Sequence, residues 1–179
     1  MEQPIIIRKE TPEDYTRVVE LTEIAFKGLE FSDGKEGKLV ENLHQSSLFI
    51  PELSLVAEVD GELAGHILFT PIRIENENET FETLSLAPVS VLPEFQKQGI
   101  GSRLIEAGHQ KAKELGFRSI IVVGHPHYYP RFGYRPASKW GIKAPFDLPS
   151  DDVFMATELD DEALKGISGT VIFPAEYGL

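Results

Sequence analysis

One stretch of the chain decides the fold: residues 89–102 read VSVLPEFQKQGIGS. Its β-branched start predicts the end of a strand, and a loop with Gly99 and Gly101 then leads into a helix expected over Ser102–Leu115. A helix N-terminus presents free backbone N–H groups and a positive dipole end, so it attracts anions. The two glycines let the backbone approach a phosphate closely, and Lys97 adds positive charge at the rim. The stretch therefore predicts an anion-binding loop suited to a pyrophosphate.

Two other kinds of phosphate-binding loop are excluded by the spacing of the glycines. Residues 99–104, GIGSRL, lack the third glycine of the dinucleotide-binding fingerprint, and no glycine is followed by Lys-Ser or Lys-Thr as a Walker loop requires. A nucleotide-phosphate enzyme that uses the same loop is therefore the weakest alternative. Glycines that only turn a corner of the chain are a further alternative at this point.

Hydrophobic periodicity predicts alternating strands and helices on both sides of this stretch. The elements expected before it are a short buried strand, two helices and three long strands: Ile5–Ile7, Pro12–Lys27, Lys38–Gln45, Leu53–Val59, Leu63–Ile74 and Phe81–Val91. Three strands are expected after the helix, the first of them fully buried: Ser119–Val123, Val153–Leu159 and Thr170–Phe173. Asp60-Gly61 predicts a hairpin, and Pro88 predicts a bulge or an open edge in its strand.

Two predicted helices have assignable inner faces. Leu39 and Leu43 are expected to point inward from the second helix. The helix after the glycine loop is expected to bury four residues: Leu104, Ile105, Ala112 and Leu115. No repeat or linker marks a second domain, so one α/β domain is expected.

Composition and charge limit the partners of this domain. The 179 residues include no cysteine, which excludes a disulfide framework and an acyl-cysteine intermediate and favours the cytosol. The net charge of −12 disfavours nucleic acid and anionic lipid, and no signal peptide or membrane anchor is visible. The charge is uneven, because residues 91–145 hold nine basic and three acidic side chains. A small polyanion would suit that segment, and a cationic second substrate would suit the acidic remainder.

Two motifs carry a resemblance to a known family. Gln96 to Gly101, read as Gln-x-x-Gly-x-Gly between a strand and a helix, resembles motif A of the GNAT superfamily of N-acetyltransferases. Tyr129 to Tyr134, YPRFGY, is similar to the Tyr-x-x-x-Gly-Phe element that follows the fifth strand in that family. The stretch 141–177 resembles a bacterial branch of predicted acetyltransferases.

The resemblance implies the fold and the domain limits. It implies a single GNAT domain over residues 1–179, with core motifs in 4–137 and a strand-containing C-terminal extension in 138–179. The expected class is α/β (α+β mixed), with a central mixed, mostly antiparallel sheet flanked by helices. Strands are expected to splay apart at the coenzyme A site.

The same resemblance implies the residues that bind acetyl-CoA, the co-substrate. The amides around four residues would hold the coenzyme A pyrophosphate, and two side chains would line the same loop: Gln98, Gly99, Gly101 and Ser102, then Gln96 and Lys97. The strand at Val89 and Val91 would pair with the pantetheine arm, and an N–H near Val91 would polarise the thioester carbonyl. No metal is expected, because His125-x-His127 lacks a third ligand at suitable spacing.

Tyr129 is the implied catalytic residue, a general acid for the leaving thiolate. The general base stays open. Ser85 stands where some family members carry a glutamate, and four weak candidates remain: Glu30, Glu82, His125 and His127. The acidic residues of the first interhelical loop would steer a cationic amine, or merely be solvated: Glu30, Asp33 and Glu36. His44, His66 and His109 are expected to face solvent or to be satisfied internally.

The expected function is an N-acetyltransferase that transfers the acetyl group of acetyl-CoA to a primary amine by direct attack in a ternary complex. The alternative is a non-catalytic acyl-CoA-binding or regulatory module that keeps the loop and lacks the chemistry. The acceptor stays open among aminoglycosides, polyamines, amino acids, peptide N-termini and protein lysines. Donors longer than acetyl and the oligomeric state, including a homodimer, also stay open.

Overall fold

The computed structural model describes residues 3–179. Within these residues the chain forms nine strands and three α-helices: β1 Ile5–Lys9, α1 Tyr15–Phe26, α2 Glu36–His44, β2 Ser54–Val59, β3 Glu62–Glu75, β4 Thr80–Val91, α3 Ile100–Glu114, β5 Ser119–Val123, β6 Arg135–Pro136, β7 Ile142–Lys143, β8 Phe154–Glu158 and β9 Gly169–Ile172. The strand order is β1-β2-β3-β4-β5-β8-β6, and β9 pairs with both β3 and β7. The β4–β5 and β7–β9 pairs are parallel, and the β1–β2, β2–β3, β3–β9, β5–β8 and β6–β8 pairs are antiparallel, which confirms the expected mixed α/β fold.

The described residues fall into two compact units. The first contains the residues up to Thr70 together with 87–111 and 176–178. The second contains 71–86, 112–175 and Leu179. The chain of β3, of β4 and of α3 passes from one unit into the other. The predicted division into 4–137 and 138–179 stays a prediction.

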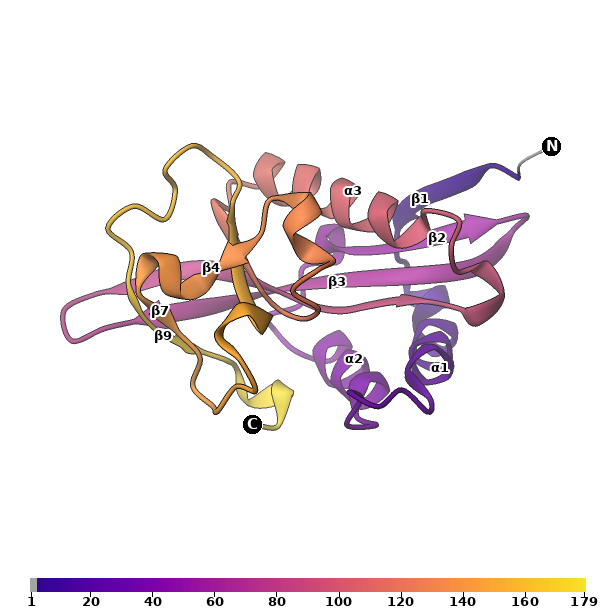
Figure 1. Ribbon diagram of the computed structural model, residues 1–179. Coiled ribbons are helices and arrows are strands. Elements are labelled where there is room, and N and C mark those ends of the chain that lie inside the picture. Colours follow the sequence, from indigo (N-terminus) through magenta and orange to yellow (C-terminus); the bar gives the residue numbers. More distant parts are fainter. Residues whose placement is uncertain (1–2) are drawn as a thin grey trace. The chain divides into compact units, whose positions relative to one another are not determined.

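In the first unit, α1 and α2 cover one face of the sheet and α3 covers the other (Figure 1). Val18 of α1 and Val40 of α2 pack in one buried cluster with Val56 of β2. On the opposite face the helix approaches the sheet closely at Gly108, where a Cβ atom would lie 2.1 Å from Cε2 of Phe69. Only a residue without a side chain allows that approach, so Gly108 fixes how closely α3 packs on β3.

The predicted turns and helices of this unit are largely confirmed. Asp60 and Gly61 both have positive φ, 52° and 76°, as a two-residue hairpin turn requires. The first helix begins with a 3-10 turn over Pro12–Asp14 and continues as α1. In α2, Leu43 is buried as expected, but the second inward residue is Val40, and Leu39 is only half-buried.

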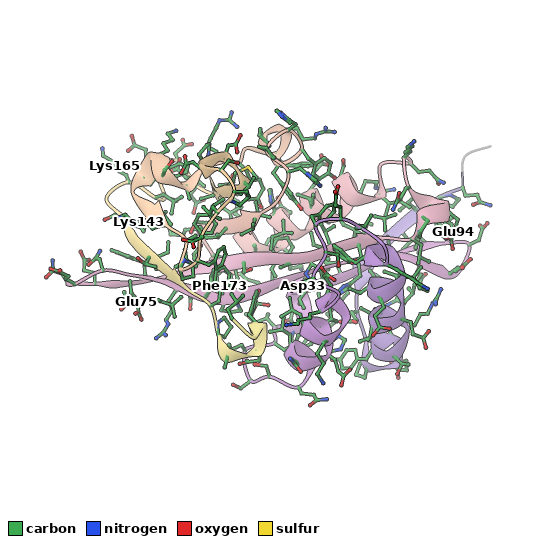
Figure 2. All side chains as sticks on the ribbon, turned by 60° about the horizontal axis from the view of Figure 1, so that its bottom comes forward. Asp33, Glu75, Glu94, Lys143, Lys165 and Phe173 are labelled. Atoms are coloured by element: carbon green, nitrogen blue, oxygen red, sulfur yellow. The ribbon has the colours of Figure 1, made fainter. Side chains whose placement is uncertain are left out.

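The second unit is built on β5 and β8, which pair over their full lengths. Ile121 of β5, Phe154 of β8 and Val171 of β9 belong to one buried cluster. The register of β9 against the end of β3 includes Glu75↔Thr170. Glu75, which ends β3 and is labelled in Figure 2, therefore lies beside a strand from the C-terminal part of the chain.

Several predictions about burial and boundaries were wrong. The run Ile5–Ile7 lies in an edge strand instead of a buried one, and Ile6 is 53% exposed. Leu115 follows the end of α3 at Glu114 and is 44% exposed. The helix begins at Ile100, two residues before the predicted start. Val123 is also exposed at the end of β5. The two-residue strands β6 and β7 carry no periodic signal and were not predicted. Among residues 3–179 there is no helix with the length and apolar character needed to span a bilayer.

Candidate active site

The glycine loop of the first unit has a left-handed backbone at two positions. Lys97 has φ 64° and Gly99 has φ 79°, and α3 begins immediately afterwards at Ile100. The N–H of Arg103 donates to the Gly99 carbonyl at 3.1 Å, which is the first helical hydrogen bond. The N–H groups of the three preceding residues, including Gly101 and Ser102, therefore have no acceptor inside the helix. The loop and the helix N-terminus together present several donors, the arrangement that binds anions.

Space is not the reason for glycine at position 99. A Cβ atom built on Gly99 meets nothing within 4 Å, so the positive φ is what this position requires. Lys97 adopts the same region despite its side chain, an arrangement that costs energy and is frequent at functional sites. Residues 96–99 are all exposed. The loop is thus a shaped, accessible surface with positive charge.

The strand that enters this loop exposes one of its hydrogen-bonding edges. Leu92 donates its N–H to the Ala64 carbonyl of β3 at 2.9 Å. Backbone groups alternate along a strand, so the N–H and C=O of Val91 and Val89 point away from β3. The described register of β4 with β5 ends at Ser85, whereas β4 continues to Val91. The edge at Val89 and Val91 is suited to an extended ligand.

Gln96 occupies one acceptor on that edge. Its Nε2 donates to the Val91 carbonyl at 3.1 Å. This bond ties the loop to the end of β4 and leaves the N–H of Val91 as the donor on the same edge. The role of Gln96 in binding the donor stays a prediction, and the motif alone did not indicate its side-chain partner.

Tyr129 lies in the second unit, at the start of a 3-10 turn, and is 7% exposed. Gly124 allows this packing, since a Cβ there would lie 2.3 Å from Cε2 of the Tyr129 ring. Tyr128 and Tyr134 contact the same ring edge to face, with centroids at 5.1 and 5.6 Å. Burial raises the pKa of Tyr129 well above its usual value, and the neighbouring Tyr128 adds a smaller effect in the same direction. The phenol is therefore protonated at neutral pH, the form that can donate a proton.

No carboxylate occupies position 85, where some members of the family carry a glutamate. Ser85 is buried in β4 and pairs with Ile121. The four other candidates for the base are all exposed: Glu30, Glu82, His125 and His127. In the part of the chain from residue 3 onward, no group of three or more His, Cys, Asp or Glu side chains could hold a metal ion.

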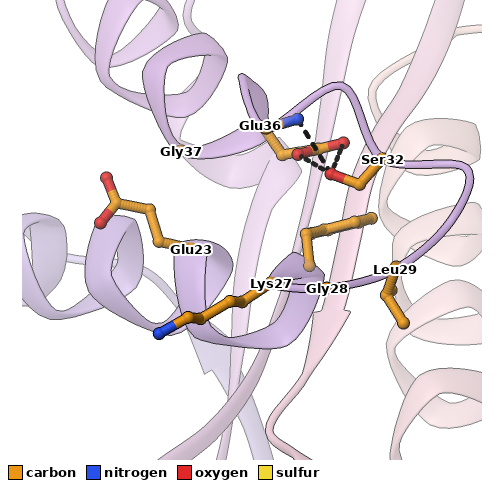
Figure 3. A pocket seen from close by; sticks show the side chains of 9 residues that line it. Glu23, Lys27, Gly28, Leu29, Ser32, Glu36 and Gly37 are labelled. Carbon is orange, nitrogen blue, oxygen red and sulfur yellow. Dashed lines mark hydrogen bonds between the residues drawn. The ribbon is translucent and has the colours of Figure 1, made fainter.

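A pocket of about 380 Å³ lies in the first unit where α1 leads into α2 (Figure 3). Its lining residues are Glu23, Phe26, Lys27, Gly28, Leu29, Ser32, Gly34, Glu36 and Gly37. Ser32 donates its hydroxyl to both carboxylate oxygens of Glu36, at 2.7 and 2.8 Å. Of the three acidic residues predicted to steer a cation, Glu36 lines the pocket and Glu30 and Asp33 do not. Glu23 also lines the pocket, and no sequence motif had selected it.

Comparison with known proteins identifies the family. Residues 18–134 match the acetyltransferase (GNAT) family. The uncharacterized N-acetyltransferase YjhQ of Escherichia coli K12 is 36% identical over 139 residues, which cover 77% of this chain and 76% of YjhQ. The uncharacterized N-acetyltransferase YhbS of the same strain is 29% identical over 174 residues, 97% of this chain and 98% of YhbS.

Solved structures agree with this assignment. The YhbS crystal structure from E. coli, in complex with CoA, superposes with a TM-score of 0.88 at 25% identity and covers 100% of this chain and 94% of that one. A GNAT family acetyltransferase from Brucella melitensis, in complex with acetyl-CoA, gives a TM-score of 0.79 at 32% identity, with 98% and 99% coverage. The chain belongs to the GNAT family and is an acetyl-CoA-dependent acyltransferase.

Proposed function

We propose that this acyltransferase moves the acetyl group of acetyl-CoA to a primary amine by direct attack in a ternary complex. One observation carries the proposal: a left-handed loop at Lys97 and Gly99 joins an open strand edge at Val91 to the N-terminus of α3. The loop offers donors to a pyrophosphate and the strand edge offers backbone pairing to an extended amide-containing arm. The structures of YhbS with CoA and of the Brucella protein with acetyl-CoA support this assignment.

The residues that hold the donor follow from these two features. The amides around Gln98, Gly99, Gly101 and Ser102 bind the pyrophosphate, and Lys97 adds charge. The edge of Val89 and Val91 pairs with the pantetheine arm. Acetyl-CoA supplies an activated acyl group as a thioester. The N–H of Val91 donates to its carbonyl oxygen, where negative charge develops during attack.

The chain has no cysteine to carry the acyl group, so the amine nitrogen attacks the thioester carbon directly. The N–C bond forms, the C–S bond breaks, and Tyr129 donates a proton toward the leaving thiolate. Because Ser85 offers no carboxylate, the acceptor ammonium first passes one proton to water. After the attack the nitrogen passes a second proton to Tyr129, which restores the phenol. Tyr129 is suited to its role because burial keeps the phenol protonated.

The acceptor is proposed to be a cationic amine. The pocket between α1 and α2 is lined by Glu23 and Glu36, which outnumber its one cation, Lys27. The net charge of −12 adds a long-range attraction for a positively charged substrate. We also infer a cytoplasmic location, with no nucleic-acid or membrane partner.

Calorimetric titration with acetyl-CoA, with NAD and ATP as controls, tests the donor site. Selective binding of acetyl-CoA supports the proposal, and tighter binding of either control refutes it. Release of CoA in the presence of a polyamine, an aminoglycoside or a lysine peptide then tests the chemistry. Tyr129→Phe is expected to bind acetyl-CoA normally and to lose about 10²-fold or more in turnover, whereas Tyr128→Phe serves as the matched control. A wild-type protein that binds acetyl-CoA and acetylates no amine would support the non-catalytic alternative.

A further inference from the structure

Four polar side chains form a buried cluster in the first unit, which we term the Glu10 cluster: Glu10, His44, Ser54 and His66. The Glu10 carboxylate has no exposed surface, and Nε2 of His44 lies 3.0 and 3.1 Å from its two oxygens. The Ser54 hydroxyl donates to Glu10 at 2.6 Å. Nε2 of His66 lies 2.8 Å from the same hydroxyl. The cluster thus connects the end of β1, the end of α2, β2 and β3.

The single hydroxyl proton of Ser54 determines which groups donate and which accept in this cluster. The Ser54 hydroxyl has a single hydrogen and gives it to Glu10, so its oxygen accepts from Nε2–H of His66. Burial lowers the pKa of His66 to about 4, although the nearby charge of Glu10 opposes this shift, so its ring is neutral at pH 7. A neutral ring with a proton on Nε2 has a bare lone pair on Nδ1. That nitrogen is buried and has no hydrogen-bond partner within the described residues.

Ser90 of β4 carries a second buried polar atom of this kind. The residue is 2% exposed, and its Oγ has no hydrogen-bond partner among residues 3–179. The bond from Leu92 N–H to the Ala64 carbonyl sets the local register of β3 and β4, and this register places Ser90 opposite His66. Buried polar atoms in native proteins are nearly always paired, so two unpaired neighbours call for a common explanation.

Both side chains also lie on the same face of the sheet. His66 is paired with Val56 in the β2–β3 register, and Val56 packs in one buried cluster with Leu92. Ser90 is two residues before Leu92 on the same strand, so its side chain points to that face as well. Directly opposed residues on one face of an antiparallel pair have Cβ atoms about 5 Å apart.

We propose that one buried water joins the Ser90 hydroxyl to Nδ1 of His66, and so extends the Glu10 cluster into β4. The chain Glu10–Ser54–His66–Ser90 then crosses the sheet from β1 to β4 as one hydrogen-bonded unit. Ser90 lies between Val89 and Val91, whose outward edge is assigned to the pantetheine arm. Ser90 and His66 are therefore positioning residues for the donor strand, an inference whose effect on catalysis rests on the proposed function.

Nitrogen NMR of His66 tests the link without any substrate. In wild-type protein at pH 7 we expect the Nε2–H tautomer with Nδ1 accepting a hydrogen bond. Ser90→Ala should move the Nδ1 resonance toward that of a free ring nitrogen and leave Nε2 protonated. Ser119→Ala removes another buried hydroxyl, which pairs with Thr83 at 2.7 Å, and should leave His66 unchanged. An Nδ1 resonance that does not respond to Ser90→Ala would overturn the proposal.

Acetyl-CoA kinetics test the positioning role. Ser90→Ala is expected to raise KM for acetyl-CoA by about 2- to 10-fold, the worth of one hydrogen bond, with a smaller change in kcat. Ser90→Thr keeps the hydroxyl and should restore most of the loss. If Ser90→Ala does not fold, His66→Gln keeps a donor toward Ser54, removes the Nδ1 acceptor and should raise KM similarly. Unchanged KM in a folded variant contradicts the positioning role. Failure of wild-type protein to bind acetyl-CoA contradicts the proposed function instead, because the NMR result is independent of it.

Discussion

Acid conditions should destabilise this protein through His66, whose ring is fully buried. The folded-state pKa of about 4 lies below the usual histidine pKa of 6.5, which the unfolded chain retains. Between these two values the unfolded chain binds a proton that the folded chain does not. Stability contributed by the neutral ring is therefore present above pH 6.5 and is lost as the pH falls toward 4.

The size of this loss follows from the two pKa values. Their full difference corresponds to about 3 kcal/mol, of which about 2 kcal/mol is lost by pH 5. His109 shifts in the same direction for the same reason, because burial lowers its pKa to about 4. Glu10, His44 and Asp14 are the charged or titratable groups that act on His66. Their own titration changes the stability of wild type and variant alike, so the prediction concerns the difference between the two proteins.

Urea unfolding at pH 7, 6 and 5 measures the effect. The wild-type protein is compared with His66→Gln, which cannot titrate but keeps an amide donor for Ser54, and with His127→Gln, which removes an exposed histidine, as the control. The stability difference between wild type and His66→Gln should change by about 2 kcal/mol between pH 7 and pH 5, in the direction that favours the variant in acid. Parallel pH profiles for wild type and His66→Gln would refute the reasoning.

Two further predictions concern glycine and loop geometry. Gly108→Ala should lower the free energy of unfolding by about 1–3 kcal/mol, because the new methyl group overlaps the Phe69 ring. Thermal unfolding measures this loss. An unchanged melting temperature would show that α3 moves away from β3 without a loss of stability. Lys97→Gly should relieve the strain of the positive φ and raise the free energy of unfolding by up to about 1 kcal/mol. The same variant should bind acetyl-CoA more weakly and with a smaller salt dependence, which calorimetry at two salt concentrations measures. An equal salt dependence in wild type and variant would show that Lys97 does not contact the phosphate.

Local signals in the sequence predicted most of the elements. Asp60-Gly61 predicted its hairpin correctly, since two residues with positive φ are a property of the turn itself. The predicted start of α3 was two residues late, because glycine lowers helix propensity while the tertiary contact of Ile100 holds the first turn in place. The short strands β6 and β7 depend on partners elsewhere in the chain, so no local pattern marked them.

The sequence by itself determined the family and the anion-binding loop. The glycine spacing before a helix sets the local backbone conformation, and this conformation does not depend on contacts with distant parts of the chain. Only the tertiary structure decided which edge of β4 is open, that Gln96 binds the Val91 carbonyl, and that burial raises the pKa of Tyr129. The Glu10 cluster likewise joins residues up to 56 positions apart in the chain. Pairings of this kind depend on sheet register and on desolvation, and neither is encoded by any neighbouring stretch of residues.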